Sequence, residues 1–293
     1  MTAYSPIVDR PAVSWPDEKP VAFYLGVNLE HFAPGPAINI YPRTNGLDPD
    51  VLNQGWRDYG ARVGIWRMIE SLDRRGVPVT GLLNAAVCAE QPEIVAAGVE
   101  RGWTWVAHGW QNNVLLADLP PEDEEAHLRT SVETIARATG SRPRGWLGPA
   151  LTQTHRTEEL LTGLGIEYVL DWCHDDLPGW RRPGLLSVPF SVEVNDLTIF
   201  LLRGQSGPEL VRVVKDQAAQ LRREGGGRVM ALSVHPFLTG QAFRQRYLDE
   251  ALDHLLGLDD VWVTTADDIA SSYGRAVAET SLSAENSGSI VPS

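Results

Sequence analysis

GWTWVAHGWQNN, residues 102–113, joins an apolar run to a cluster of polar side chains. The run at 103–107 is rich in β-prone residues and predicts a strand. His108 follows this strand directly, and the amides Asn112 and Asn113 come shortly after it. Because a packed strand holds the side chain at its end in place, the stretch predicts a functional site at a strand end.

The same arrangement recurs along the chain. Apolar runs typical of buried strands alternate with segments of helical periodicity, and the sequence contains neither a G-x-G-x-x-G nor a P-loop motif. This alternation predicts an α/β fold, a single-domain, distorted (β/α) barrel with about seven parallel strands, rather than a nucleotide-binding open sheet. The expected strands are 21–29, 77–83, 103–107, 144–147, 166–170, 228–234 and 261–264, with short strands at 185–189 and 198–202 in an insertion; the expected helices are 59–75, 92–101, 121–139, 157–164, 208–224, 247–256 and 266–273.

Polar or charged residues follow four of the expected strands. They are Glu30, His108, Asp171 and His235. In a parallel barrel the active groups sit at the carboxyl ends of the strands. We therefore expect these four side chains to meet at the mouth of the barrel.

The chain is expected to have three parts. Residues 1–20 are rich in proline and polar groups and predict an N-terminal arm. Residues 21–275 form the barrel domain, in which the long segment 33–56 has many turn residues and predicts a loop that covers the site. Residues 276–293 are rich in Ser, Ala, Glu, Gly and Asn, which predicts a disordered tail.

Composition limits the function classes. A formal charge of -13 and a pI near 5.0 argue against nucleic acid and anionic membranes as partners, because binding phosphate requires basic clusters. No apolar signal segment or long uncharged apolar stretch is found, so we expect a soluble, cytoplasmic protein. Cys88 and Cys173 match no zinc or redox spacing, which also indicates reduced thiols.

Five motifs follow one another in an order that resembles the polysaccharide deacetylase superfamily. The resemblance spans about residues 21–269, and DDLP followed by Trp180, together with HPFLTGQAFR (235–244), is similar to the branch of allantoinases and cyclic imide hydrolases. It implies a barrel hydrolase that acts on carbon–nitrogen bonds and a homo-oligomer, a dimer or a tetramer. The motifs are NLEH (28–31), AHGWQNN (107–113), RPRGWLGPA (142–150), DWCHDDLP (171–178) and LSVHPFLTG (232–240).

Two positions depart from the family's usual pattern. Its typical members hold a divalent metal with one aspartate and two histidines spaced at i and i+4, whereas here the i+4 partner of His108 is Asn112. The acidic pair of the first motif is replaced by Asn28 and Glu30. An amide cannot accept a proton at neutral pH, so the family's usual base and one of its metal ligands are missing.

The expected catalytic residues are Glu30, His108, His235 and Asp175. Glu30, with His235 or Asp175, would activate water, and histidine titrates in the range needed for proton transfer. A zinc ion held by Glu30, His108 and His235, with His31 as a substitute ligand, would satisfy the minimum of three protein ligands. Metal-independent catalysis by the same groups is the alternative. Asp171 is expected to orient a histidine.

The expected substrate-binding residues surround these groups. Four tryptophans in or beside the motifs predict the walls of a closed pocket for a small, flat ligand, although tryptophans also stack on polysaccharides. Asn112 would donate to a substrate carbonyl, and Asp176 is either one of a carboxylate pair with Asp175 or a turn cap. The tryptophans are Trp110, Trp146, Trp172 and Trp180.

These observations predict a hydrolase that opens a small cyclic amide, imide or ureide at its C–N bond. A linear amide hydrolase and a polysaccharide N-deacetylase are the alternative enzymes. A catalytically silent binding protein on the same fold is the alternative from another class, because it would also lose the usual base and second histidine.

Overall fold

One sheet of nine strands organises the computed structural model, which describes residues 4–33, 37–44 and 47–287. Its strands follow the order β6-β7-β5-β4-β3-β2-β1-β8, and β9 pairs with β1. Every pairing is parallel except that of β6 with β7. The strands are β1 (Val21–Leu29), β2 (Val79–Leu83), β3 (Thr104–Ala107), β4 (Gly145–Trp146), β5 (Tyr168–Val169), β6 (Gly179–Arg182), β7 (Leu185–Ser187), β8 (Arg228–Val234) and β9 (Val261–Thr264).

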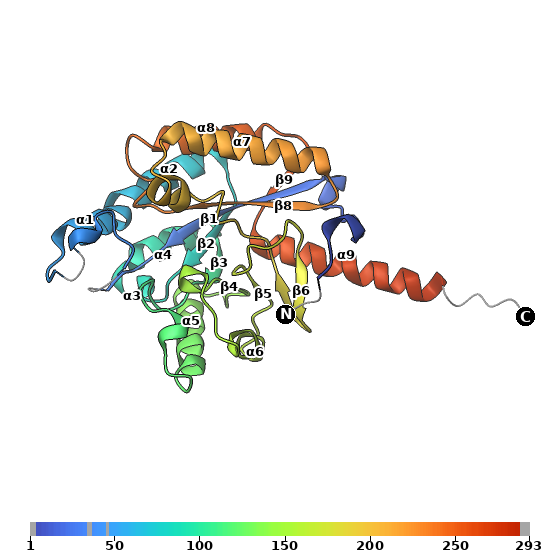
Figure 1. Ribbon diagram of the computed structural model, residues 1–293, viewed down its shortest axis with the longest axis horizontal. Helices are drawn as coiled ribbons and strands as arrows, with labels where there is room; N and C mark the ends of the chain where they lie inside the picture. Colours follow the sequence, from blue (N-terminus) through green and yellow to red (C-terminus); the bar gives the residue numbers. More distant parts are fainter. Residues whose placement is uncertain (1–3, 34–36, 45–46, 288–293) are drawn as a thin grey trace, which may run out of the picture.

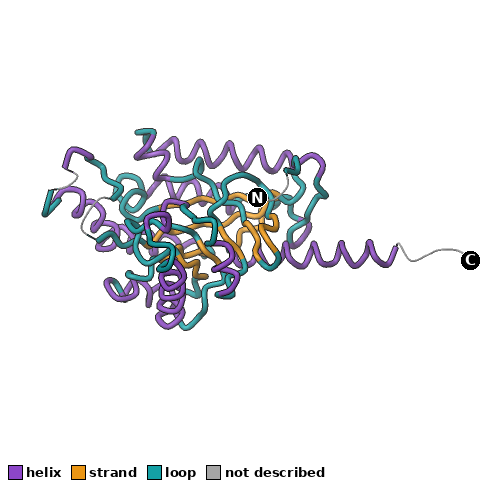
Figure 2. The backbone as a smooth tube through the Cα atoms, turned by 60° about the horizontal axis from the view of Figure 1, so that its bottom comes forward, coloured by secondary structure: helices purple, strands orange, loops and turns teal. Residues whose placement is uncertain are grey.

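Helices surround the curled sheet (Figures 1 and 2). This arrangement confirms the predicted distorted (β/α) barrel. The C-terminal part of α9 extends away from the body of the molecule in both views. The α-helices are α1 (Val51–Tyr59), α2 (Ile65–Arg75), α3 (Val87–Glu90), α4 (Pro92–Glu100), α5 (Glu124–Thr139), α6 (Thr157–Gly163), α7 (Gly207–Glu224), α8 (Gln245–Leu256) and α9 (Ala266–Ser287).

The alternation of side chains along the strands determines which residues face the interior of the curled sheet. One set of apolar side chains packs against α2, α5, α7 and α8, and the set on the opposite face forms a second cluster inside the curl. Side chains two residues apart share a face, so the residues that follow the strands continue these two faces. Tyr24, Val106 and Ala231 belong to the cluster inside the curl. Each lies an even number of residues before Glu30, His108 and His235, respectively, so these three side chains are on the inner face as well.

The described part of the N-terminal arm lies across the starts of β8 and β9. Trp15 is buried, and its indole N–H donates to the carbonyl of Arg228 at 3.0 Å. Lys19 Nζ donates to the carbonyl of Val261 at 3.2 Å. The arm therefore covers the end of the barrel opposite the carboxyl ends of the strands.

Residues 198–202 do not form the strand expected there. They belong to a π-helical segment, Leu197–Leu202. A short, uninterrupted apolar run is compatible with a strand or with a buried helix, and periodicity alone cannot separate the two.

The expected tail and the expected loop are both partly helical. Helix α9 continues to Ser287, beyond the point at which we expected disorder, and Ala and Glu in this segment favour a helix. Residues 288–293 lie outside the described residues. Helix α1 starts within the expected loop 33–56, where the carboxylate of Asp50 caps it by accepting the N–H of Asn53. Residues 34–36 and 45–46 of this loop are also outside the described residues.

A π-helical segment, Gly60–Gly64, joins α1 to α2 and packs against the loop that follows β8. A Cβ atom on Gly64 would collide with the carbonyl oxygen of Pro236, and one on Gly60 would lie 2.7 Å from the backbone nitrogen of Phe237. The two glycines therefore let this helix approach the backbone beside His235.

We expect Gly64→Ala to lower the free energy of unfolding by about 1–3 kcal/mol, because the close backbone contact has no room for a methyl group. Gly55→Ala in α1 is the matched control: a Cβ there has no neighbour within 4 Å, and alanine should stabilise this exposed helix by about 0.5–1 kcal/mol. Urea unfolding of both variants measures the difference. Equal changes would contradict the close contact.

Candidate active site

Glu30, His108 and His235 meet at the carboxyl ends of β1, β3 and β8. Glu30 Oε1 lies 3.4 Å from His108 Nε2 and 3.6 Å from His235 Nε2. All three side chains are at most 5% exposed. The structure therefore brings together three of the four residues that were expected to be catalytic.

Both histidines are oriented through their Nδ1 atoms. His108 Nδ1 lies 2.8 Å from the carbonyl oxygen of Leu147, and His235 Nδ1 lies 2.6 Å from Asp196 Oδ1. A carbonyl oxygen and a carboxylate can only accept, so each Nδ1 carries a proton and donates it. The Nε2 atoms of both rings are consequently the ones that face Glu30.

Asp196 is a functional residue that the sequence did not indicate. It is fully buried just before the π-helical segment Leu197–Leu202, and it accepts hydrogen bonds from the backbone N–H of His235 at 2.8 Å and from Thr239 Oγ1 at 2.5 Å. We expected Asp171 to orient a histidine, but Asp196 does so. The one feature of the sequence that could have indicated Asp196 is its position directly before the apolar run 197–202.

Glu30 and His235 shift each other's pKa. Burial alone would raise the pKa of Glu30, but the charge of His235 and hydrogen bonds with both histidines lower it to about 2. Burial alone would lower the pKa of His235, but the charges of Asp196 and Glu30 raise it to about 10. At neutral pH, Glu30 is therefore a carboxylate and His235 an imidazolium.

Two asparagines hold Glu30 and the loops beside it. Asn112 Nδ2 donates to Glu30 Oε1 at 2.8 Å, so its N–H is directed at Glu30 rather than at the substrate carbonyl that we expected. Asn84, which the sequence analysis did not single out, accepts the backbone N–H of His31 at 3.0 Å and donates to the carbonyl of His108. Asn84 thereby links the loop after β1 to the loop after β3.

The arrangement around Glu30 suits a proton better than a divalent metal. Among the described residues, no three His, Cys, Asp or Glu side chains form a group that could hold a metal ion. The N–H of Asn112 points at Glu30 Oε1, and a donor in that position repels a cation placed on the same oxygen. The donor set therefore does not fit the zinc ion expected on Glu30, His108 and His235. The ring of the possible substitute ligand, His31, does not join this cluster.

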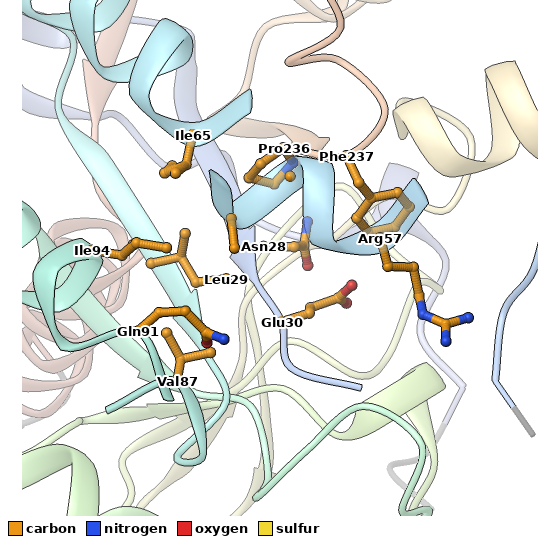
Figure 3. A pocket seen from close by; sticks show the side chains of 12 residues that line it. Asn28, Leu29, Glu30, Arg57, Ile65, Val87, Gln91, Ile94, Pro236 and Phe237 are labelled. Atoms are coloured by element: carbon orange, nitrogen blue, oxygen red, sulfur yellow. The ribbon is translucent and has the colours of Figure 1, made fainter. Parts of the chain in front are cut away.

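A pocket lies beside Glu30 (Figure 3). It has about 320 Å³ of empty space, including its mouth. Glu30 Oε2 is buried and has no hydrogen-bond partner in the described structure. The pocket therefore lies beside a residue whose second carboxylate oxygen has no protein partner in the described structure. It is lined by Asn28, Leu29, Glu30, Arg57, Gly60, Ala61, Ile65, Val87, Gln91, Ile94, Pro236 and Phe237.

Asp175 and Asp176 do not reach this pocket. The chain that follows β5 crosses the barrel, and the carbonyl of Asp176 accepts the N–H of Val229 at the start of β8. Asp175 forms an ion pair with Arg10 of the N-terminal arm at 2.6 Å. The expected catalytic role of Asp175 and the expected binding role of Asp176 are not supported, because both residues lie toward the other end of the barrel.

The four tryptophans do not form the walls of the Glu30 pocket. Trp146 is fully buried among the side chains that face the helices, and Trp180 is 42% exposed and lines a separate pocket beside the N-terminal arm. Trp172 donates to Glu158 at 2.9 Å and stacks with Arg181. The fourth tryptophan, Trp110, is half-buried against the core.

The aromatic wall is made of other residues. Phe237 lines the pocket, and its ring centroid lies 4.9 Å from that of Trp56 and 6.2 Å from that of Phe32. These residues come from the loop after β1, from α1 and from the loop after β8. The sequence analysis did not identify Phe32, Trp56 and Phe237 as wall residues, because their three segments come together only in the folded chain.

Asp171 lies at a strand end as expected, but its hydrogen bonds go to residues of the loop after β4 and not to a histidine. It accepts the N–H of Gly148 at 2.6 Å and of Gln153 Nε2 at 2.5 Å. Burial raises its pKa to about 6, although both hydrogen bonds act in the opposite direction. Asp171 therefore holds the loop after β4.

The comparisons with known proteins agree with this fold. A putative polysaccharide deacetylase of Schizosaccharomyces pombe is 29% identical over 240 residues, which cover 74% of each chain. The structure of a probable polysaccharide deacetylase from Pseudomonas aeruginosa PAO1 superposes with a TM-score of 0.83 at 23% identity, covering 91% of this chain and 95% of that one. PuuE allantoinase superposes with a TM-score of 0.82 at 22% identity, covering 91% and 94%.

Two more findings complete the comparison. In the described part of the chain, no helix combines the length and the apolar character needed to span a bilayer. Residues 57–169 match the polysaccharide deacetylase family. This segment is therefore similar to polysaccharide deacetylases, and the whole chain shares the fold of the solved structures named above.

Proposed function

We propose that this chain opens a small cyclic amide, imide or ureide by metal-independent acid–base hydrolysis of its C–N bond. The observation that carries the proposal is the buried triad Asp196–His235–Glu30, in which a protonated imidazole faces a carboxylate. Hydrolysis of an amide needs a base for water and an acid for the leaving nitrogen, and this pair supplies both.

The pair allows a balanced reaction. A water beside Glu30 Oε2 gives one proton to Glu30 while its oxygen attacks the carbonyl carbon of the ring. The C–N bond of the resulting tetrahedral species breaks as His235 gives its Nε2 proton to the leaving nitrogen. The proton on Glu30 then passes to His235 across the short gap between them, which restores both groups. The product is an open chain that carries a carboxylic acid and an amine, amide or urea nitrogen.

Burial of the catalytic groups favours a small substrate over a polymer. Glu30 and both histidines are almost fully buried, and the pocket beside them is narrow. The shared fold with PuuE allantoinase adds support for a ureide. The relatives described as polysaccharide deacetylases support the alternative, N-deacetylation of a polysaccharide, equally well by similarity. Linear amides would use the same chemistry.

The test is hydrolysis of allantoin, dihydrouracil, hydantoin, succinimide and chitin oligomers, before and after chelation, with elemental analysis of the purified protein. We expect ring opening that chelation changes by less than about twofold, because the proton transfers use only side chains. Release of acetate from the oligomers without ring opening would support the polysaccharide alternative. Loss of activity on chelation with near-stoichiometric metal would contradict the metal-independent mechanism. No turnover of any compound would favour the silent binding protein.

A further inference from the structure

Arg57, at the end of α1, lines the same pocket as Glu30 (Figure 3). It is 8% exposed, and its guanidinium lies 5.1 Å from the ring centroid of Phe32. Its Nη1 donates to the carbonyl of Ile38 at 3.1 Å and to the side-chain oxygen of Asn39. A buried cation is thus held at the aromatic side of the pocket by neutral oxygens.

The charge of Arg57 is not neutralised by an ion pair. In the described residues, no carboxylate oxygen lies within 4.0 Å of its guanidinium. Burial lowers its pKa, although the charges of Asp50 and Asp58 act in the opposite direction. An arginine in a protein interior is normally paired with an anion, because desolvating an unpaired charge is costly.

The catalytic groups cannot supply this anion. The negative charge of Glu30 is balanced by the imidazolium of His235, which lies next to it. Arg57 therefore has no carboxylate in direct contact, although Asp50 and Asp58 lie near enough to stabilise its charge. A guanidinium binds a carboxylate through two parallel N–H donors, and an uncharged ring or sugar has no group that can neutralise it in this way.

We propose that Arg57 is the specificity-determining residue of this site and binds a carboxylate carried by the cyclic substrate. This inference rests on the proposed ring-opening function and narrows its substrates to rings with a carboxylate side group. The carboxylate would lie at the guanidinium while the scissile carbonyl lies at Glu30. A role for Arg57 in merely holding residues 38 and 39 is the competing explanation.

Paired substrates separate the two explanations. Hydantoin-5-acetate and hydantoin share a ring and differ in a carboxylate, as do dihydroorotate and dihydrouracil. We expect the wild-type protein to favour the acid of each pair in kcat/KM by about 10-fold or more, since a charge-assisted hydrogen bond contributes about 1.5–3 kcal/mol. Arg57→Gln should lower kcat/KM for the acids by about 10–100-fold, chiefly through KM, and much less for the neutral rings. Arg57→Lys should restore part of the preference.

Arg62→Gln is the matched control, because Arg62 is an exposed arginine in the adjoining π-helical segment. It should leave the preference for acids as in the wild type. A wild-type protein that treats both members of each pair alike would overturn the inference. So would an Arg57→Gln variant that loses equal activity on acids and neutral rings, since that result indicates a structural role.

A binding measurement decides the role of Arg57 even without turnover. Calorimetry with hydantoin-5-acetate compares the Glu30→Gln variant with the Glu30→Gln, Arg57→Gln double variant. Binding that the second substitution weakens by about 10-fold or more supports the inference, even if no ring is hydrolysed and the proposed function fails. Equal affinity, or no binding to either variant, overturns it.

Discussion

Glu30→Gln should lower kcat by about 10³-fold or more, the largest loss that we expect from one substitution. Glutamine has nearly the shape of glutamate, but its amide cannot accept the proton of water. General base catalysis contributes about 10²–10⁴-fold, and loss of the carboxylate also removes one of the two anions, Asp196 and Glu30, that raise the pKa of His235. Initial rates on the best ring substrate measure the effect.

Glu90→Gln is the matched control for this substitution. Glu90 is an exposed glutamate at the end of α3 and does not line the Glu30 pocket. We expect its kcat to stay within about twofold of wild type. If Glu30→Gln retained more than a tenth of the wild-type kcat, Glu30 would not be the base. Intact binding of ring compounds by a protein without turnover would favour the silent binding protein.

Asp196→Asn should have the second-largest effect, a loss of about 10²–10⁴-fold in kcat. The carboxylate of Asp196 accepts the Nδ1 proton of His235, and an asparagine can present its NH₂ group there instead. The ring would then lose its orientation toward Glu30. It would also lose the negative charge that helps to hold its proton.

The pH profile separates this mechanism from simple misfolding. In the wild type, Glu30 stays ionised down to about pH 2 and His235 stays protonated up to about pH 10, so kcat/KM should be flat across the neutral range where the protein is folded. Without the charge of Asp196 the pKa of His235 falls, and the high-pH limb of Asp196→Asn should move toward neutral pH. Asp171→Asn is the control, because Asp171 is also a buried strand-end aspartate but contacts no catalytic histidine. Asp171→Asn should leave the high-pH limb of the kcat/KM profile unchanged. An unmoved limb in Asp196→Asn would contradict the acid role of His235.

The local pattern of apolar residues was sufficient to predict the strands that hold Glu30, His108 and His235. The apolar runs that become β1, β3 and β8 were found with nearly their observed boundaries, and the residue after each run was identified as a site residue. This succeeds because a parallel barrel places the carboxyl ends of its strands at one end, so the sequence position of a residue after a strand also determines its place in space.

Position in a motif did not predict position in space where the chain changes direction or where the strand is very short. Asp175 lies four residues after the strand-end residue Asp171, yet the segment between them leads to the other end of the barrel. Trp146 lies in a motif but on the face of β4 that packs against helices. A strand only two residues long gives no clear alternation from which its inner face could be predicted.

By itself, the sequence determined the barrel, the strand ends and three residues that meet there, because hydrophobic periodicity and strand-end position are local properties of the chain. Only the tertiary structure decided which carboxylate orients His235, which amide holds Glu30 and which cation shares the pocket. Asp196 contacts His235 and Asn112 contacts Glu30 from segments that are distant in sequence, and Arg57 lines the same pocket as Glu30. Their roles depend on distances and burial, and these exist only after the sheet has curled and the loops have packed over its open end.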